Sequence, residues 1–462
     1  TWNVFEDKDP HMDALDRLSG FAAHLQFDPL PATVKEQLGW VLADTIAAMA
    51  AGSAEPELRA LAARQTAHGG ATLVGLGQRT QAQAAALING TAGTFLEMDE
   101  GNRFSRGHPA VHVLPALLAL CETQQLDLPT FLSALVVGYE VGSRIGAASQ
   151  LRGAMHPHGT WGTIGAAAAS ARAWGLDAGD MRETINVGAS MTIATSKKTM
   201  LEGGLVRNVY AGLSNHNGLL AAQLVQCGFS GERDGVASLF GQIVSERYDT
   251  EVLLRDLGED WHLMHNYFKR HSCCRYNHGT LDALDSIAAR GPLPAPEQVA
   301  SVRVRTYGLA AELVDPAPRN TLAAKFSVPF AVATRIVRGS SGLASFTWDA
   351  VRDERVLALA RKVEVVEDPD MTRRLPDERP AHVLITSTDG RQWSGEVGVN
   401  RGDDASPYTP QELAAKFMEL CGRVWPQEHA SELLQATLSL TAGRGNLGEW
   451  LSLLRRPPST PR

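Results

Sequence analysis

Leu30-Pro-Ala-Thr-Val34-Lys-Glu-Gln-Leu38-Gly-Trp-Val41-Leu42-Ala-Asp-Thr-Ile46 is a segment whose apolar side chains recur every three or four residues. From Val34 to Ile46 this spacing places them on one face of an α-helix. The stretch Gly165-Ala-Ala-Ala-Ala-Ser-Ala171 adds small side chains that let helices approach closely. We therefore expect a buried helical bundle. Comparable helical runs occur at 81–96, 113–124, 129–150, 162–174 and 209–226.

The pattern changes after Lys269. Val302-Arg-Val-Arg-Thr306 and parts of 363–367 alternate apolar and polar side chains, which indicates β-strands. Segment 382–399 reads as a hairpin with its turn at Asp389-Gly390. A small sheet is therefore expected between about 270 and 400.

Helical signals return near the C-terminus. Thr409-Pro410-Gln-Glu412 supplies a helix N-cap followed by proline at the first helical position, so a helix is predicted over 410–422. The predicted fold is mainly α: a large all-helical domain with an inserted smaller α+β lid domain. The helical domain takes residues 1–269 and 401–462, and the lid takes residues 270–400.

Length and composition limit the classes of function. A chain of 462 residues with 44% hydrophobic content can bury a large core. The formal net charge is -8 and no run of lysine and arginine stands out, so we expect no nucleic-acid partner and no attraction to anionic membranes. The polar, acidic start and the lack of an apolar run of about 18 residues predict neither a signal peptide nor a membrane span.

The five cysteines are odd in number and show no CxxC pair, which argues against a disulfide framework and a structural zinc site and favours a reducing cytoplasm. Gly443-Arg-Gly-Asn-Leu-Gly448 matches a dinucleotide-binding pattern, but too little chain follows it to build a βαβ unit. Phosphate-loop, zinc-protease and serine-hydrolase signatures are absent from the sequence. We therefore expect no cofactor and no metal.

The segment Glu97-Met-Asp-Glu-Gly-Asn-Arg-Phe-Ser-Arg-Gly-His-Pro-Ala-Val-His-Val113 is the densest polar interruption between two helical runs. Asp99 and His108 offer a proton-transfer pair, and Asn102 and Arg103 offer groups that bind an anion. We interpret the segment as an active-site loop. The alternative is a solvated loop between two helices.

Three further clusters interrupt the apolar sequence. His156 and its neighbours precede a helix whose N-terminal amides can receive an anion. Arg207 follows two glycines, an arrangement that suits a guanidinium clamp for a carboxylate. The third cluster, from Lys269 to His278, lies at the proposed domain junction. Its adjacent cysteines, Cys273 and Cys274, reach one tetrahedral metal ion poorly.

Together these motifs resemble the MmgE/PrpD family, which includes 2-methylcitrate dehydratase, cis-aconitate decarboxylase and iminodisuccinate epimerase. The resemblance covers nearly the whole chain and implies a helical domain with an α+β lid, an active site between them, a homodimer, and cofactor-independent chemistry on small polycarboxylates. It rests on Gly107-His108-Pro109 with Val-Leu-Pro-Ala-Leu-Leu at 113–118, His156-Pro-x-Gly-Thr-x-Gly162, Arg207-x-x-Tyr210-Ala-Gly212, Lys269-x-x-x-x-Cys274-Arg275-x-x-His278 and Ala324-Lys325-Phe326-Ser327.

The resemblance also assigns residues. Asp99, His108, His156 and Lys269 match the family's catalytic positions. Arg207 stands where decarboxylase-like members have lysine. Two departures leave the substrate open. Glu100-Gly-Asn102-Arg103 replaces an aspartate-rich sequence of the dehydratase-like members, and Glu312 or Leu313 stands at the position of the decarboxylase's lid tyrosine.

We predict a cofactor-independent lyase that removes a proton α to a carboxylate of a small di- or tricarboxylate, as a 2-methylcitrate or citrate dehydratase does. His108, oriented by Asp99, is the expected base, and His156 is the expected acid. The expected substrate-binding residues are Asn102, Arg103, Arg207, Cys274 and His278. The alternatives are an epimerase of an iminodisuccinate-like dicarboxylate, a cis-aconitate-type decarboxylase, and a non-catalytic carboxylate-binding protein.

Overall fold

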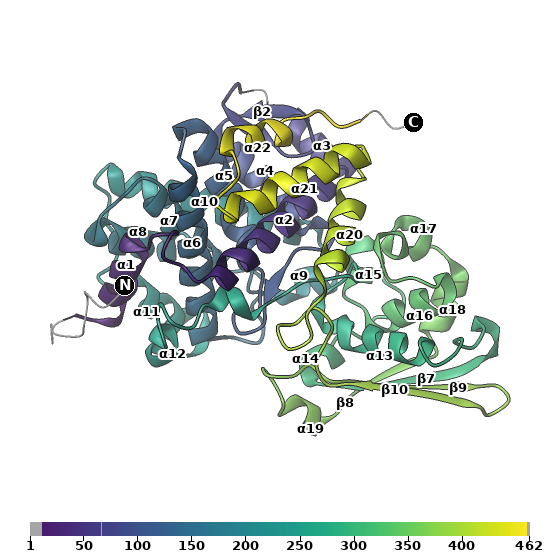
Figure 1. The fold of residues 1–462 in the computed structure, drawn as a ribbon. Helices are drawn as coiled ribbons and strands as arrows, with labels where there is room; N and C mark the ends of the chain where they lie inside the picture. The colour runs from purple at the N-terminus through teal and green to yellow at the C-terminus, as the bar shows by residue number, and fades with distance from the viewer. Residues whose placement is uncertain (1–11, 66, 460–462) are drawn as a thin grey trace.

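The computed structural model describes residues 12–65 and 67–459, and most of them are helical (Figure 1). The acidic start at residues 1–9, on which the signal-peptide prediction rests, lies outside this range. The predicted helical runs are confirmed to within a few residues. The larger helices of the first part are α1 (Ala14–His24), α2 (Ala32–Ser53), α3 (Pro56–Ala63), α4 (Ala82–Phe95), α5 (Pro109–Gln124), α6 (Leu128–Ala148), α7 (Trp161–Ala173), α8 (Ala178–Ser190) and α10 (Val209–Gln226).

Small residues bring α6 and α7 into close contact, as the alanine-rich sequence predicts. A Cβ added at Gly138 of α6 would lie 2.8 Å from the carbonyl oxygen of Gly165 and 2.8 Å from the Cβ of Ala169. Any larger side chain there would force the two helices apart. Leu38, Val41, Leu42 and Ile46 of α2 are fully buried in the same large core, which is the face that their spacing predicts.

The helical part is not entirely helical, contrary to the prediction for residues 1–269. It contains short strand pairs: β1 (Ala71–Leu73) with β2 (Gln78–Thr80), β3 (Gly101–Asn102) with β6 (Asn266–Tyr267), and β4 (Ser149–Leu151) with β5 (Ser245–Tyr248). Strands this short give no alternating pattern that a sequence can reveal. Short helices α9 (Lys197–Leu201), α11 (Gly235–Ser238) and α12 (Thr250–Leu254) complete this part.

A four-stranded sheet lies at the lower right of Figure 1, with the strand order β10-β9-β7-β8. Strands β7 (Val299–Thr306) and β8 (Val363–Glu367) are parallel, and β9 (Ala381–Ser387) and β10 (Gln392–Val397) form the predicted hairpin around Gly390. The helices of this region are α13 (His278–Ala288), α14 (Gly308–Ala311), α15 (Thr321–Lys325), α16 (Val328–Arg338), α17 (Trp348–Val351), α18 (Glu354–Ala360) and α19 (Pro369–Thr372). These elements bury an apolar cluster of their own, separate from the helical core.

The last helices return to the helical part. Helices α20 (Pro410–Cys421), α21 (Gln427–Thr441) and α22 (Leu447–Leu454) add buried side chains to its large core. Helix α20 begins with the predicted N-cap and proline, and Thr409 and Glu412 also form a capping box. Lys416 of α20 forms a buried ion pair with Asp44 of α2 and donates a 2.7 Å hydrogen bond to the carbonyl of Met98. The C-terminal helices therefore hold the loop that carries Asp99.

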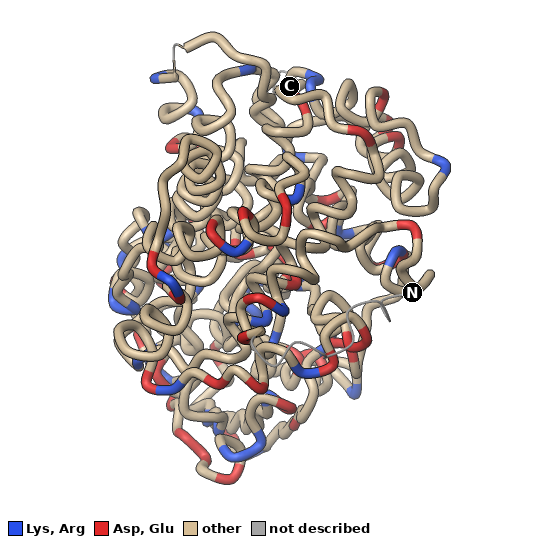
Figure 2. The backbone as a smooth tube through the Cα atoms, turned by 90° about the vertical axis from the view of Figure 1, so that its left-hand side faces the viewer, with Lys and Arg blue, Asp and Glu red and all other residues tan. Residues whose placement is uncertain are grey.

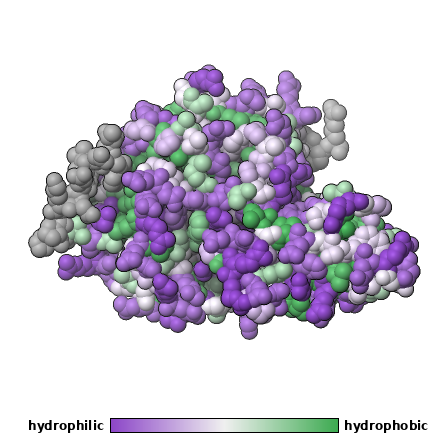
Figure 3. Space-filling view, turned by 60° about the horizontal axis from the view of Figure 1, so that its bottom comes forward, coloured by the Kyte–Doolittle hydropathy of each residue, from purple (hydrophilic) through white to green (hydrophobic). Residues whose placement is uncertain are grey.

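Charged residues of both signs are interspersed along the backbone in Figure 2. The face shown in Figure 3 is mostly hydrophilic, with apolar residues in small scattered groups. Among the described residues, no helix combines the length and the apolarity that crossing a membrane requires.

Candidate active site

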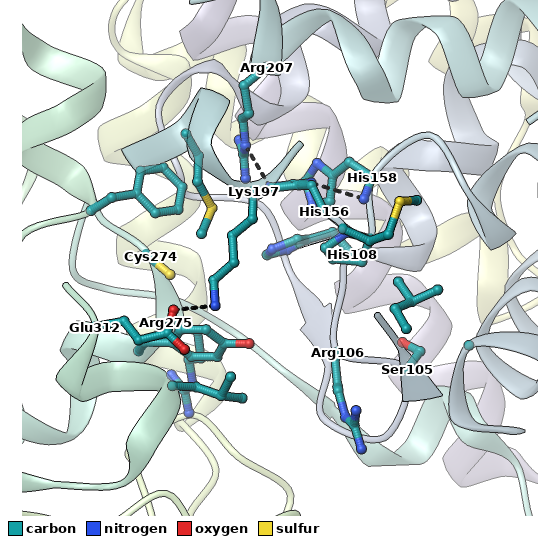
Figure 4. Close-up of a pocket in the computed structure, with 18 of the residues that line it drawn as sticks. Ser105, Arg106, His108, His156, His158, Lys197, Arg207, Cys274, Arg275 and Glu312 are labelled. Atoms are coloured by element: carbon teal, nitrogen blue, oxygen red, sulfur yellow. Dashed lines mark hydrogen bonds and ion pairs between the residues drawn. The ribbon is translucent and has the colours of Figure 1, made fainter. Parts of the chain in front are cut away.

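A cavity of ≈ 210 Å³ lies between the helical part and the sheet-containing part (Figure 4), a size suited to a small molecule. The loop between α4 and α5 supplies His108, the segment before α7 supplies His156 and His158, and Arg207 precedes α10. The sheet-containing part supplies the opposite wall: Cys274, Arg275, Tyr276, Leu309, Glu312, Phe326 and Arg379.

The loop from 97 to 108 is held in a fixed shape by Asn102. Its side-chain oxygen accepts hydrogen bonds of 3.0 Å from the backbone N–H groups of Phe104 and Ser105, and its amide nitrogen donates a 2.8 Å bond to the carbonyl of His262. Pairing of Gly101 with Tyr267 joins the loop to the segment that carries Lys269. These bonds position His108 at the end of the loop, immediately before α5.

His108 has a defined tautomer. Its Nδ1 lies 2.6 Å from the carbonyl oxygen of Glu100 and 3.3 Å from the Oδ2 of Asp99. Because a carbonyl oxygen only accepts, Nδ1 carries the proton and Nε2 keeps a free lone pair. Burial, together with the Lys269 cation, lowers the pKa of His108 well below its usual value. The ring is therefore neutral at pH 7 and ready to accept a proton.

Two carboxylates and two cations form a buried cluster behind His108. Lys269 Nζ lies 3.2 Å from Glu97 Oε2 and 3.6 Å from Asp99 Oδ1, and Arg207 forms a short ion pair with Glu97. Burial alone would raise the pKa of Glu97, but the charges of Arg207 and Lys269 outweigh it and hold the pKa at about 2. Burial and the charge of Glu97 raise the pKa of Asp99. The carboxylates in turn raise the pKa of Lys269 against the effect of burial.

His156 and His158 stand next to this cluster. The backbone N–H of His158 donates a 3.1 Å bond to Nδ1 of His156, and the Nε–H of Arg207 donates a 3.3 Å bond to Nε2 of His156. The ring of His158 meets those of His108 and His156 edge-on, with centroid distances of 5.1 and 4.7 Å. Burial and the Arg207 cation lower the pKa of both His156 and His158 well below the usual value. Both rings are therefore neutral.

The cavity wall carries an excess of positive charge. Six lining residues are lysine or arginine, and two are glutamate. Among the described residues, Arg106 has no hydrogen-bonding or ion-pair partner, and it holds a left-handed backbone with φ of 56°. The cationic residues are Arg106, Arg152, Lys197, Arg207, Arg275 and Arg379. Such a wall suits a ligand with more than one carboxylate.

Comparison with known proteins finds one family along the chain. The MmgE/PrpD N-terminal domain profile matches residues 16–246, and the MmgE/PrpD C-terminal domain profile matches residues 271–441. The chain belongs to the MmgE/PrpD family. Over 487 residues it is 26% identical to the cis-aconitate decarboxylase-like protein oryM of Aspergillus oryzae, covering 97% of this chain and 98% of that protein. Over 472 residues it is 24% identical to the cis-aconitate decarboxylase of Aspergillus terreus, covering 96% of each.

Several predicted site residues of this MmgE/PrpD protein lie at the cavity, and others do not. His108, His156, Arg207 and Cys274 line it. Asp99 and Lys269 lie behind the wall, with side chains that are 1% and 0% exposed. Burial, with Glu97, raises the pKa of Cys274 to about 11, so it presents a neutral thiol.

Asn102, Arg103 and His278 do not line the cavity, and protein groups bind each side chain. Arg103 donates hydrogen bonds to two residues far along the chain: 3.1 Å to the carbonyl of Asp377 and 3.2 Å to the carboxylate of Asp404. His278 accepts a 3.1 Å hydrogen bond at Nδ1 from Arg275. Asn102 shapes the loop as described above.

Other lining residues were not predicted. Glu97 lies two residues before the predicted loop acid and His158 lies in the second histidine motif, so local sequence contained a signal for both. Lys197 is followed by Lys198 and precedes Gly203 and Arg207, so this cationic segment contained a signal for it as well. Arg379 lies far along the chain without any motif, and only folding brings it to the cavity.

The described residues contain one group with the spacing of metal ligands: His271, Asp282 and Asp285. Protein donors already occupy this group. Asp282 Oδ2 accepts from the backbone of Arg401 at 3.0 Å, and Asp285 Oδ1 accepts from Arg335 at 2.8 Å. None of the three residues lines the cavity.

Proposed function

We propose that this protein is a lyase that removes a proton α to a carboxylate of a small di- or tricarboxylate, without a metal or organic cofactor. The observation that carries the proposal is the free Nε2 of neutral His108, which faces a cavity with six cationic side chains. A proton α to a carboxylate is weakly acidic, so its removal requires both a base and strong stabilisation of the resulting anion.

His108 acts as the base, and Asp99 acts through it. When Nε2 takes the substrate proton, the ring becomes an imidazolium whose Nδ1–H donates to the carbonyl of Glu100, with the carboxylate of Asp99 3.3 Å from the same nitrogen. This contact stabilises the charge that forms, as the carboxylate of a catalytic triad does. Lys269, fully buried between Glu97 and Asp99, positions both carboxylates. Asn102, Arg103 and His278 support the walls.

Arg207 stabilises the developing anion, and His156 donates a proton to the leaving group. Arg207 is 2% exposed, so its guanidinium acts where water does not compete. Two donors face the ring of His156: the backbone N–H of His158 at Nδ1 and the Nε–H of Arg207 at Nε2. When a substrate carboxylate binds the Arg207 guanidinium in place of His156, Nδ1 remains an acceptor, so the single proton of the neutral ring resides on Nε2. That proton can pass to a departing hydroxide, which leaves as water. Dehydration is therefore balanced by one proton taken by His108 and one given by His156.

Decarboxylation is the second candidate, because two relatives of matching length are named cis-aconitate decarboxylase or a protein like it. Loss of CO2 leaves a carbanion, which the same cations stabilise and which His156 protonates. Epimerisation shares the first step with dehydration and is the third candidate. The non-catalytic alternative predicts binding without turnover. Assembly as a homodimer belongs to this proposal, and light scattering of the purified protein measures it.

A panel of di- and tricarboxylates in D2O, followed by NMR, tests the proposal. Deuterium uptake, a new double bond, or CO2 identifies proton exchange, dehydration or decarboxylation respectively. The His108→Gln variant is expected to lose the signal, and His382→Gln, on strand β9 outside the cavity lining, is the matched control. Absence of all three signals with every compound would refute an enzymatic role and support the binding protein.

A further inference from the structure

An ion pair joins the two walls of the cavity. Lys197, the first residue of α9 in the helical part, forms a short ion pair with Glu312, which follows α14. Figure 4 shows the Lys197 side chain extending from the side of the histidines to Glu312 on the opposite wall. The Lys197 side chain is 16% exposed and that of Glu312 is 46% exposed. The pair therefore lies toward the open side of the cavity.

The backbone ties Lys197 to the segment that carries His156. The N–H of Lys197 donates to the carbonyl of Ala154 at 2.9 Å, and the N–H of His156 donates to the carbonyl of Thr195 at 2.9 Å. Lys197 thus has a fixed position relative to the reacting groups. It lies in the same wall as His156 and Arg207, but its ammonium reaches the other side.

Glu312 is an unusual residue for this place. It and Glu97 are the two carboxylates among the described lining residues. Glu97 is buried between Arg207 and Lys269, whereas Glu312 is half-exposed and pairs with one lysine. A glutamate carboxylate and a substrate carboxylate offer the same acceptor oxygens to an ammonium group. Lys197 therefore already binds a carboxylate, the same group that the proposed ligand carries.

A second cation lies at the same side without a counter-ion. Arg106 lines the cavity, is exposed, and has no hydrogen-bonding or ion-pair partner among residues 12–65 and 67–459. Its φ of 56° is costly for a non-glycine residue and is the kind of strain that accumulates at ligand sites. Arg106 lines the same cavity as Lys197, Glu312 and Tyr276.

We propose that Lys197 and Arg106 form a distal subsite for a second carboxylate of the substrate, and that Glu312 occupies this subsite in the empty protein as an internal competitor. The inference rests on the proposed function, because it assumes that the ligand carries at least two carboxylates. Ligand binding exchanges one ion pair for another: the substrate carboxylate pairs with Lys197, and Glu312 turns to solvent. A monocarboxylate bound near Arg207 leaves the pair intact.

Removing the competitor is expected to strengthen binding. A partly exposed ion pair is worth up to about fivefold in an equilibrium. We expect Glu312→Gln to tighten the binding of citrate by about fivefold and to leave acetate unchanged. Lys197→Gln is expected to change citrate binding little by itself and to abolish the gain from Glu312→Gln, because it removes both the competing ion pair and the pair with the substrate.

Isothermal titration calorimetry with citrate and acetate tests the subsite on wild type, both single variants and the double variant. Glu364→Gln, an exposed carboxylate on β8 outside the cavity lining, controls for the change in net charge. The proposal expects that Glu312→Gln gives no gain when Lys197 is also replaced. Thermal midpoints close to wild type show that the variants are folded.

The outcomes separate the two proposals. Equal or weaker citrate binding by Glu312→Gln, a gain matched by Glu364→Gln, or a gain that survives loss of Lys197 overturns the subsite. No citrate binding by wild type or by Glu312→Gln also overturns it. Citrate binding with the expected variant pattern but no proton exchange, dehydration or CO2 release in D2O leaves the subsite standing and removes the proposed lyase activity.

Discussion

Replacing Glu100 by glutamine is expected to change how the stability of the protein depends on pH. The Glu100 side chain is fully buried, with Oε1 accepting from the N–H of Ala110 and Oε2 accepting from the hydroxyl of Tyr139, both at 3.0 Å. Burial raises the pKa of Glu100 to about 8 from its usual 4.5. The folded protein therefore keeps this carboxyl protonated at neutral pH, and glutamine is close in shape to the protonated form.

Proton linkage gives the direction and the size of the pH effect on the free energy of unfolding. A folded pKa above the unfolded value means that the contribution to stability is fully present below pH 4.5 and is lost as the pH rises through 8. Between pH 5 and pH 8 this single group lowers the free energy of unfolding by about 3.5 kcal/mol. For one cooperative transition of a chain of this length, that corresponds to about 4 °C in the thermal midpoint.

Differential scanning calorimetry of wild type and Glu100→Gln across this pH range measures the effect. The midpoint of the variant minus that of wild type is expected to rise by about 4 °C from pH 5 to pH 8. Glu364→Gln, which changes an exposed carboxylate, is the control and is expected to show a constant difference. A constant difference for Glu100→Gln as well would refute the reasoning, because it would mean that Glu100 is ionised in the fold.

Three further predictions concern the proposed reaction. His108→Gln is expected to lower turnover by about 100-fold or more, the usual scale for a lost general base, with a thermal midpoint near that of wild type; a folded variant with full turnover would remove His108 from the mechanism. Lys269→Ala is expected to cost about 100-fold in turnover. It should also lower stability by about 3–5 kcal/mol, because Glu97 and Asp99 lose a buried partner, and an unchanged midpoint would contradict this ion-pair assignment. Exhaustive chelation is expected to leave turnover unchanged, and loss of activity restored by one divalent ion would show that a metal is required.

Local pattern predicted most of the secondary structure because helices and hairpins depend on neighbours a few residues apart. The spacing from Val34 to Ile46 predicts α2, and the turn at Asp389-Gly390 predicts the β9–β10 hairpin. The pairing of Gly101 with Tyr267 joins segments far apart in the chain. Two residues on each side carry no periodic signal, so this pairing was missed.

The sequence by itself determined the mainly helical fold, the family, and the residue types of the candidate site, since these depend on local periodicity and on short motifs around His108, His156 and Lys269. Only the tertiary structure decided which side chains meet. Folding places Lys269 behind the cavity and brings Glu312 and Arg379 into its wall. It also fixes the protonation of His108, Glu97 and Glu100, because a pKa depends on burial and on charges that the chain brings together from distant positions.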